Sequence, residues 1–170
     1  MRRSIRSLLL ATAFAGFASG AARADVSEAD RDFIEKAARG GHEEVATGQT
    51  AAQSKNSAIA DFGNQMVREH GQMNEELAAL AKQKGVEPPD SASLMQQAKG
   101  VATSVLPGAT FDRTYVSQQL ADHKETLALM EKQASSGDDP DLKAFASKGI
   151  PVVKKHITEL EALQKQPGMQ

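Results

Sequence analysis

The 170-residue chain contains no cysteine and no tryptophan, and aromatic residues make up only 4% of it. The absence of cysteine excludes disulfide bonds, iron–sulfur clusters, thiolate catalysis and lipoprotein attachment. The folded domain must therefore be stabilised by its hydrophobic core alone.

Acidic residues are absent from the first 24 positions. This stretch combines a basic start, an apolar run over 8–18 and small residues at a cleavage position: Arg2, Arg3, Arg6, Ala22 and Ala24. The pattern predicts an export signal, residues 1–24, that is cleaved before Asp25. The run is shorter than the ~20 residues of a membrane span. A retained anchor is the alternative, and the arginine pair leaves general secretory and twin-arginine export both open.

An excess of basic residues is also lacking. Without residues 1–24 the chain keeps 16 basic and 22 acidic residues, which argues against nucleic-acid binding and against adsorption to anionic membranes. No later segment is apolar enough to span a bilayer. We therefore expect a single periplasmic domain over 25–170. Its protein partner is not identified, and a homo-oligomer is left open.

No segment alternates as a β-strand would, whereas four have helical periodicity. We expect helices over about 27–53, 56–84, 112–135 and 140–163. Short links pair the first with the second and the third with the fourth as antiparallel hairpins. The link over 85–110 can cross from one end of the helices to the other, and its 91–101 part is expected to form a short extra helix. Two hairpins with one long crossover predict an all-α, ferritin-like antiparallel four-helix bundle.

Three of the four histidines, His70, His123 and His156, fall on the apolar faces of three different predicted helices. Burying an imidazole without partners costs a few kcal/mol, and the cores of helical bundles commonly hold metal ions. Glu44 is the one carboxylate on the inward row of the first helix. The pattern predicts a metal site formed by the three histidines, with Glu44 as a fourth candidate ligand. His42 shares its face with polar residues and is expected in solvent.

The ligand types bear on which metal is bound. Imidazole with carboxylate suits Zn, Fe(II) or Mn, while imidazole with thioether suits Cu(I). Met66 and Met73 flank His70 on its helical face, but methionine on such a face is usually core filler. We therefore expect one Zn, Fe or Mn ion, with Cu as the less favoured alternative.

Two carboxylates lie near these histidines in the sequence. Glu69 adjoins His70, and Glu159 follows His156 by three residues. Either could orient a ligating imidazole through a hydrogen bond, but a solvated helix edge is the preferred interpretation of both. Pro151 removes one backbone hydrogen bond from the last helix and predicts a kink before His156.

Two function classes follow from these features. The first is a metal-binding bundle that serves metal handling or stress protection. The second is a non-catalytic structural or stress-associated bundle whose core histidines are hydrogen-bonded and bind no metal. No nucleophile–base pair, glycine-rich phosphate loop or paired-carboxylate motif is visible, so an enzyme is not predicted.

Four segments carry a resemblance to a known family: GGHEEVATGQTAAQ, FGNQMVREHGQMNEELAALAKQKGV, FDRTYVSQQLADHKETLALMEK and DPDLKAFASKGIPVVKKH. In this order they resemble the exported bacterial family called domain of unknown function 4142, over about 25–163. The resemblance implies a ferritin-like four-helix bundle, and it implies that Glu44, His70, His123, Pro151 and His156 are recurring positions. The di-iron pattern of Glu and Glu-x-x-His is not matched, so a mononuclear site of three histidines and one glutamate fits better than a di-iron centre.

Overall fold

Five helices make up most of residues 26–169, the part of the chain that the computed structural model describes. They are α1 (Glu28–Ala51), α2 (Ser57–Gln83), α3 (Leu94–Ser104), α4 (Gly108–Ser136) and α5 (Pro140–Gln164). No strand occurs within these residues, so the expected all-α class is confirmed. The extra helix in the crossover is present as α3. The predicted signal, residues 1–24, lies outside the described residues.

Capping side chains explain where three of the long helices begin. Ser27 accepts a hydrogen bond from the Asp30 amide, and Asn56 accepts one from the Ala58 amide. Asp139 caps α5, with proline in its first turn. Helix α4 begins at Gly108 without a side-chain cap. The expected start of this helix, near 112, was therefore too late, because no capping residue marks the true start.

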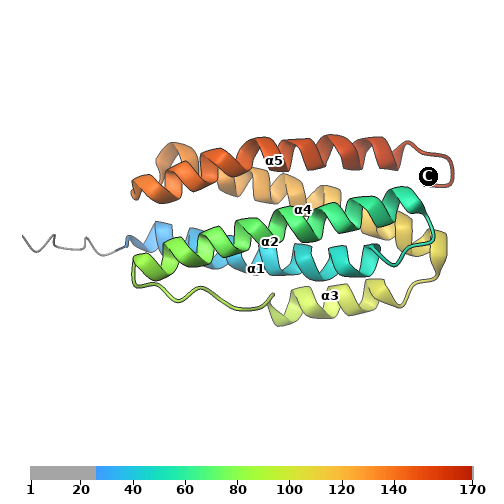
Figure 1. Cartoon of the computed structure of the whole chain (residues 1–170), viewed down its shortest axis with the longest axis horizontal. Coiled ribbons are helices and arrows are strands. Elements are labelled where there is room, and N and C mark those ends of the chain that lie inside the picture. Colours follow the sequence, from blue (N-terminus) through green and yellow to red (C-terminus); the bar gives the residue numbers. More distant parts are fainter. Residues whose placement is uncertain (1–25, 170) are drawn as a thin grey trace, which may run out of the picture.

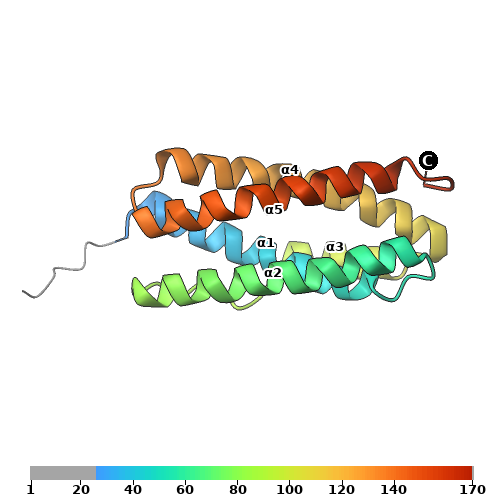
Figure 2. The same ribbon diagram turned by 45° about the horizontal axis from the view of Figure 1, so that its top comes forward.

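The four long helices lie side by side, and each runs antiparallel to its neighbours (Figures 1 and 2). Helix α1 packs against α2 and α4, and α5 packs against the same two helices. Helix α2 ends at one end of the molecule and α4 begins at the other, so their connection runs along its length and carries α3 (Figure 1). Among the helices over 26–169, none has the length and hydropathy that a bilayer span requires.

Two glycines allow α1 and α2 to approach closely. A Cβ atom at Gly63 would lie 2.6 Å from the Ala52 amide nitrogen and 2.7 Å from the Gly48 carbonyl oxygen. A Cβ atom at Gly48 would lie 3.0 Å from the Gly63 carbonyl oxygen. These neighbours are backbone atoms that cannot move aside, so the packing of this hairpin requires glycine at Gly63 and is tight at Gly48.

Helix α3 turns its polar side toward the rest of the molecule. The Lys99 Nζ lies 2.7 Å from an Asp122 carboxylate oxygen, and the Thr103 hydroxyl donates to Gln118 Oε1 across 3.0 Å. The large apolar residues of α3 and of its C-cap are exposed instead: Leu94, Met95, Val101 and Val105. These contacts fasten α3 to α4, and the Lys99 Nζ also lies 3.8 Å from Glu43 Oε1 on α1.

The buried apolar residues form two clusters, one toward each end of the long helices. One cluster contains Phe33 and Phe145 in edge-to-face contact, and the other contains Phe62 and Tyr115 in the same geometry. Between the clusters, every long helix contributes buried polar residues: Glu44, His70, Gln119, His123 and His156. The hydrophobic core is thus divided by a polar layer at mid-height.

Candidate metal centre

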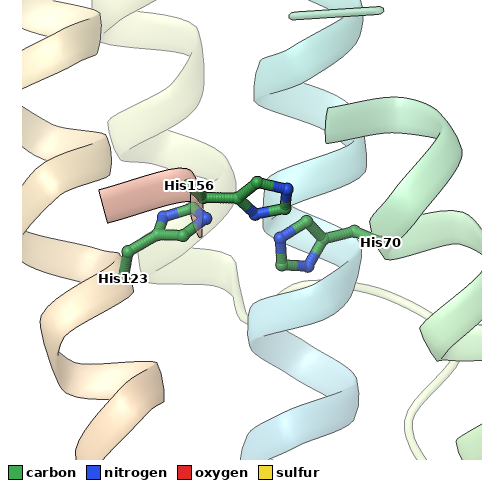
Figure 3. Close-up of side chains that lie close together, drawn as sticks. All are labelled: His70, His123 and His156. Carbon is green, nitrogen blue, oxygen red and sulfur yellow. The ribbon is translucent and has the colours of Figure 1, made fainter. Parts of the chain in front are cut away.

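Three histidine rings meet in this polar layer (Figure 3). His70 comes from α2, His123 from α4 and His156 from α5, and their exposed fractions are 3%, 0% and 0%. All three ring centroids lie 5.4 Å from one another. One nitrogen from each ring lies within 4.8 Å of the other two. The periodicity that placed these residues on three inward faces therefore brings them to one point.

Hydrogen bonds on the outer side of two rings fix where their protons lie. The His123 Nδ1 is 2.9 Å from the Gln119 carbonyl oxygen, and the His156 Nε2 is 2.7 Å from Glu69 Oε2. A carbonyl or a carboxylate oxygen only accepts, so each of these nitrogens is the donor. In a neutral imidazole the other nitrogen then carries a lone pair, which places lone pairs on His123 Nε2 and His156 Nδ1.

The inward nitrogens have no hydrogen-bond partner among the described residues. They are His70 Nε2, His123 Nε2 and His156 Nδ1, and they face one another in Figure 3. A buried polar atom without a partner costs about 1–3 kcal/mol. Three such atoms at one point form a set of donors suited to a single cation.

The spacing of the rings fits one transition-metal ion. The centre of a triangle with 5.4 Å sides lies about 3.1 Å from each ring centroid, and a metal roughly 2.0–2.1 Å from an imidazole nitrogen lies about 3.2 Å from that centroid. Nitrogens bound to one ion in this plane lie roughly 3.5 Å apart. Small rotations of the rings would therefore close them around the ion.

Burial keeps the three rings uncharged. It lowers the pKa of His70 well below 6.5, and the neighbouring histidines add to the effect. Burial lowers the pKa of His123 to about 4. Burial also lowers the pKa of His156, although the bond to Glu69 partly offsets it. At neutral pH the rings can therefore bind a cation without first releasing a proton.

Glu44 lies beside this cluster and not within it. Its Oε1 is 3.6 Å from His123 Nδ1, the nitrogen that faces the Gln119 carbonyl and not the other rings. Its Oε2 is buried and has no partner among the described residues. Burial, with the nearby charges of Asp122 and Glu43, raises the pKa of Glu44 well above 4.5. The structure thus brings the three histidines together and leaves the fourth predicted ligand adjacent to them.

The surroundings of Glu69 and His42 differ from those expected, whereas those of Glu159 agree. Glu69 bonds to His156 on another helix, so its interpretation as a solvated edge was wrong. Glu159 does sit at a partly exposed edge, where it accepts from Gln65. His42 is half-buried and its Nε2 lies 3.2 Å from the Pro89 carbonyl oxygen, contrary to the expected solvation.

The methionines near His70 are divided between the two apolar clusters. Met66 is fully buried among aromatic residues at one end. Met73 and Met130 both approach Gly149, and they line with His70 a small cavity of about 30 Å³. Met73 and Met130 are thus the methionines that line this cavity beside His70.

The fold and the site define an all-helical protein with a buried three-histidine cluster. The chain belongs to the family described as Domain of unknown function (DUF4142), which matches residues 15–163. No curated protein matches the chain. Among solved structures it is similar to one described as "CopM in the Cu(I)-bound form", with 14% sequence identity, a TM-score of 0.68, and coverage of 80% of this chain and 95% of that chain. At this identity the similarity shows a shared fold.

Proposed function

We propose that this protein binds one transition-metal ion through His70 Nε2, His123 Nε2 and His156 Nδ1 and serves in metal handling. The observation that carries the proposal is the convergence of three buried nitrogens without partners among the described residues. Two of them have their lone pairs directed inward by hydrogen bonds on the opposite side of the ring. Such outer hydrogen bonds are typical of histidines that bind metals.

The scaffold in this proposal is a ferritin-like four-helix bundle. The antiparallel packing of α1, α2, α4 and α5 and the long connection between α2 and α4 support it. The shared fold with the CopM structure is compatible with it.

The alternative is a structural bundle whose core histidines are satisfied by hydrogen bonds. That hypothesis accounts for His123 Nδ1 and His156 Nε2, which do have partners. It leaves three buried nitrogens unsatisfied within residues 26–169, at a cost that a purely structural core has no reason to retain. The geometry therefore favours the metal-binding function.

The donor set narrows the choice of metal. With Glu44 outside the cluster, three imidazole nitrogens are the donors, and imidazole suits zinc and copper better than it suits manganese. The CopM structure was solved with Cu(I) bound, which supports copper more strongly than the sequence did. We propose Zn(II) or copper as the ion. Because His123 and His156 are fully buried, the site holds the ion and offers no access to a substrate.

The proposal places this domain, residues 25–170, beyond the plasma membrane. Support comes from the basic and apolar pattern of residues 1–24. Mass spectrometry of the protein isolated from a periplasmic fraction tests this, since a chain that begins at Asp25 is expected.

The metal-binding function is tested by elemental analysis and by thermal unfolding with Zn²⁺ and, anaerobically, with Cu⁺. The wild-type protein is expected to bind one ion per chain, and an ion at 100 times its dissociation constant adds about 2.7 kcal/mol of stability. His70→Gln and His156→Gln should lose most of that gain. His42→Gln removes the histidine outside the cluster and should retain it. A metal-free wild-type protein whose melting temperature responds to neither ion would overturn the proposal.

A further inference from the structure

The three histidines are closed off from solvent. His123 and His156 are 0% exposed and His70 is 3% exposed, so an ion must pass other side chains to reach them. We propose that cations enter through the cavity between α1, α3 and α4 and that Glu44 passes them to the histidines. This inference rests on the proposed metal-binding function and assigns a role to the one predicted ligand that lies outside the cluster.

The cavity between these helices has a volume of about 460 Å³. Its lining includes four carboxylates from α1 and α4 (Glu43, Glu44, Asp122 and Glu125) and three basic side chains (Lys36, Arg39 and Lys99). Lys36 and Arg39 are paired with Asp32 and Glu35 of their own helix. Carboxylates around a concave surface raise the local concentration of cations. The cavity is therefore suited to collect metal ions before they move inward.

Glu44 connects this outer cavity to the space beside the histidines. It also lines the inner cavity of about 30 Å³, to which His70 contributes. A space of this size holds about one water-sized group. On its other side the Glu44 carboxylate is 3.6 Å from the His123 ring. Among the described residues, Glu44 is the carboxylate that lines both cavities and contacts the cluster.

The Glu44 carboxylate has a free coordination position. The side chain is 97% buried, since its exposed fraction is 3%, and its Oε2 has no hydrogen-bond partner among residues 26–169. A carboxylate oxygen in such a place gains by binding a cation. The carboxylate lies beside His123 Nδ1, on the side of the ring that faces away from the other two histidines, so it is not a ligand in the final site. This position suits a transient ligand.

Lys99 occupies the entrance as a tethered cation. Its Nζ lies 2.7 and 3.0 Å from the Asp122 oxygens and 3.8 Å from Glu43 Oε1. Because Lys99 is on α3, it bridges this helix to the acidic lining. An entering metal ion competes with the Lys99 ammonium for Asp122 and Glu43.

A second face of the molecule is less suited to entry. The cavity of about 340 Å³ between α2 and α5 is lined by Glu69, Glu76 and Met73. Glu69 is bound by His156 and Lys155, and Glu76 is bound by Lys148. Met73 also reaches the inner cavity, but it offers only a thioether. This face therefore lacks a free carboxylate that leads to the histidines.

The test measures how fast apo wild-type protein and its variants take up Zn²⁺ and, anaerobically, Cu⁺ from a chromophoric chelator by stopped flow, together with the equilibrium affinity. Glu44→Gln keeps the shape and replaces the carboxyl group by an amide. It should slow uptake and release by at least tenfold while the dissociation constant stays within threefold, because a relay changes the barrier and not the end states. Lys99→Gln should speed uptake at least threefold. The matched controls are Glu161→Gln, an exposed residue on α5, and Met73→Leu; both should load like wild type.

Several results would overturn the entry route. One is uptake by Glu44→Gln at the wild-type rate, and another is slowed uptake in Met73→Leu alone. If Lys99→Gln takes up the ion at the wild-type rate or more slowly, Lys99 does not compete with the ion for Asp122, and this path is ruled out. If the dissociation constant of Glu44→Gln rises by the same factor by which its uptake rate falls, Glu44 is a ligand of the bound ion and not a relay. If the wild-type protein binds neither ion, the proposed function fails together with the route; in the other cases the function stands and only the route fails.

Discussion

The Nε2–H group of His156 donates to Glu69 Oε2 across 2.7 Å and so joins α5 to α2. Lys155 also contacts this carboxylate, at 3.2 Å. Burial by itself raises the pKa of Glu69, but the bonds from His156 and Lys155 outweigh it and hold the pKa below 4.5. Glu69 is therefore ionised at neutral pH, and it directs the His156 Nδ1 lone pair toward the other two rings.

Loss of this carboxylate should weaken metal binding while the fold persists. Glu69→Ala is expected to lower the affinity for Zn²⁺ or Cu⁺ by roughly 10- to 100-fold, the usual effect of removing the residue that orients a metal-binding histidine. Glu69→Gln keeps an acceptor oxygen and should lose less. Glu159→Ala, at the partly exposed edge of α5, is the matched control and should bind like wild type. Equal affinity in all three variants, measured by competition with a chelator, would show that Glu69 does not orient His156.

The apo protein should lose stability as the pH falls through the range between the two pKa values of His123. The folded pKa is about 4, because burial disfavours the imidazolium, and the unfolded pKa is near 6.5. Between these values the unfolded chain binds a proton that the folded chain excludes, so the free energy of unfolding decreases as the pH is lowered. At about 1.4 kcal/mol per pKa unit, the His123 contribution falls by about 3 kcal/mol on reaching pH 4.

Urea unfolding of wild type and His123→Gln in the presence of a chelator checks this. Glu44 is present in both proteins, and its raised pKa acts in the opposite direction in both. The difference between the two proteins therefore reports His123 together with its coupling to the neighbouring histidines. The stability of wild type relative to the variant should decrease from pH 6.5 toward pH 4. A difference that does not change with pH would mean that His123 titrates normally in the folded state.

The periodicity of the sequence was sufficient to predict that the three histidines lie together in the core. Each lies on an apolar face with a repeat of 3.6 residues, and three such faces in one core must approach one another. Helix ends were predicted well where a capping residue marks them, as at Ser27, Asn56 and Asp139. Local side-chain chemistry decides both features, so a single sequence contains the information.

Contacts between helices were not predictable in the same way. Glu69 adjoins His70 in the sequence but binds His156, and Glu44 faces inward but meets the outer side of the His123 ring. Such contacts depend on the stagger and rotation of neighbouring helices, which no periodicity specifies. Helix α3 even turns its apolar side outward, because Lys99 and Thr103 fasten its polar side.

The close approach of α1 and α2 predicts opposite effects for two glycines of α2. Gly63→Ala would place a Cβ atom 2.6 Å from the Ala52 nitrogen, so the helices must separate, and we expect a loss of about 1–3 kcal/mol. Gly71→Ala is the control, since a Cβ atom there would meet no neighbouring side chain or helix within 4 Å, and it should stabilise the helix by up to about 1 kcal/mol. Urea unfolding measures both. A Gly63→Ala protein as stable as wild type would contradict the tight packing.

Asp30 on α1 should stabilise the turn between α4 and α5. It is 1% exposed and accepts hydrogen bonds from the Gln133 side chain at 2.6 Å and from the Asp139 amide at 2.9 Å. Asp30→Ala leaves these donors without their charged acceptor, and we expect a loss of about 2–4 kcal/mol in the free energy of unfolding. Asp32→Ala, which removes an exposed partner of Lys36 on the same helix, should change stability by less than about 0.5 kcal/mol. Equal losses in the two variants would show that the buried carboxylate does not join α1 to this turn.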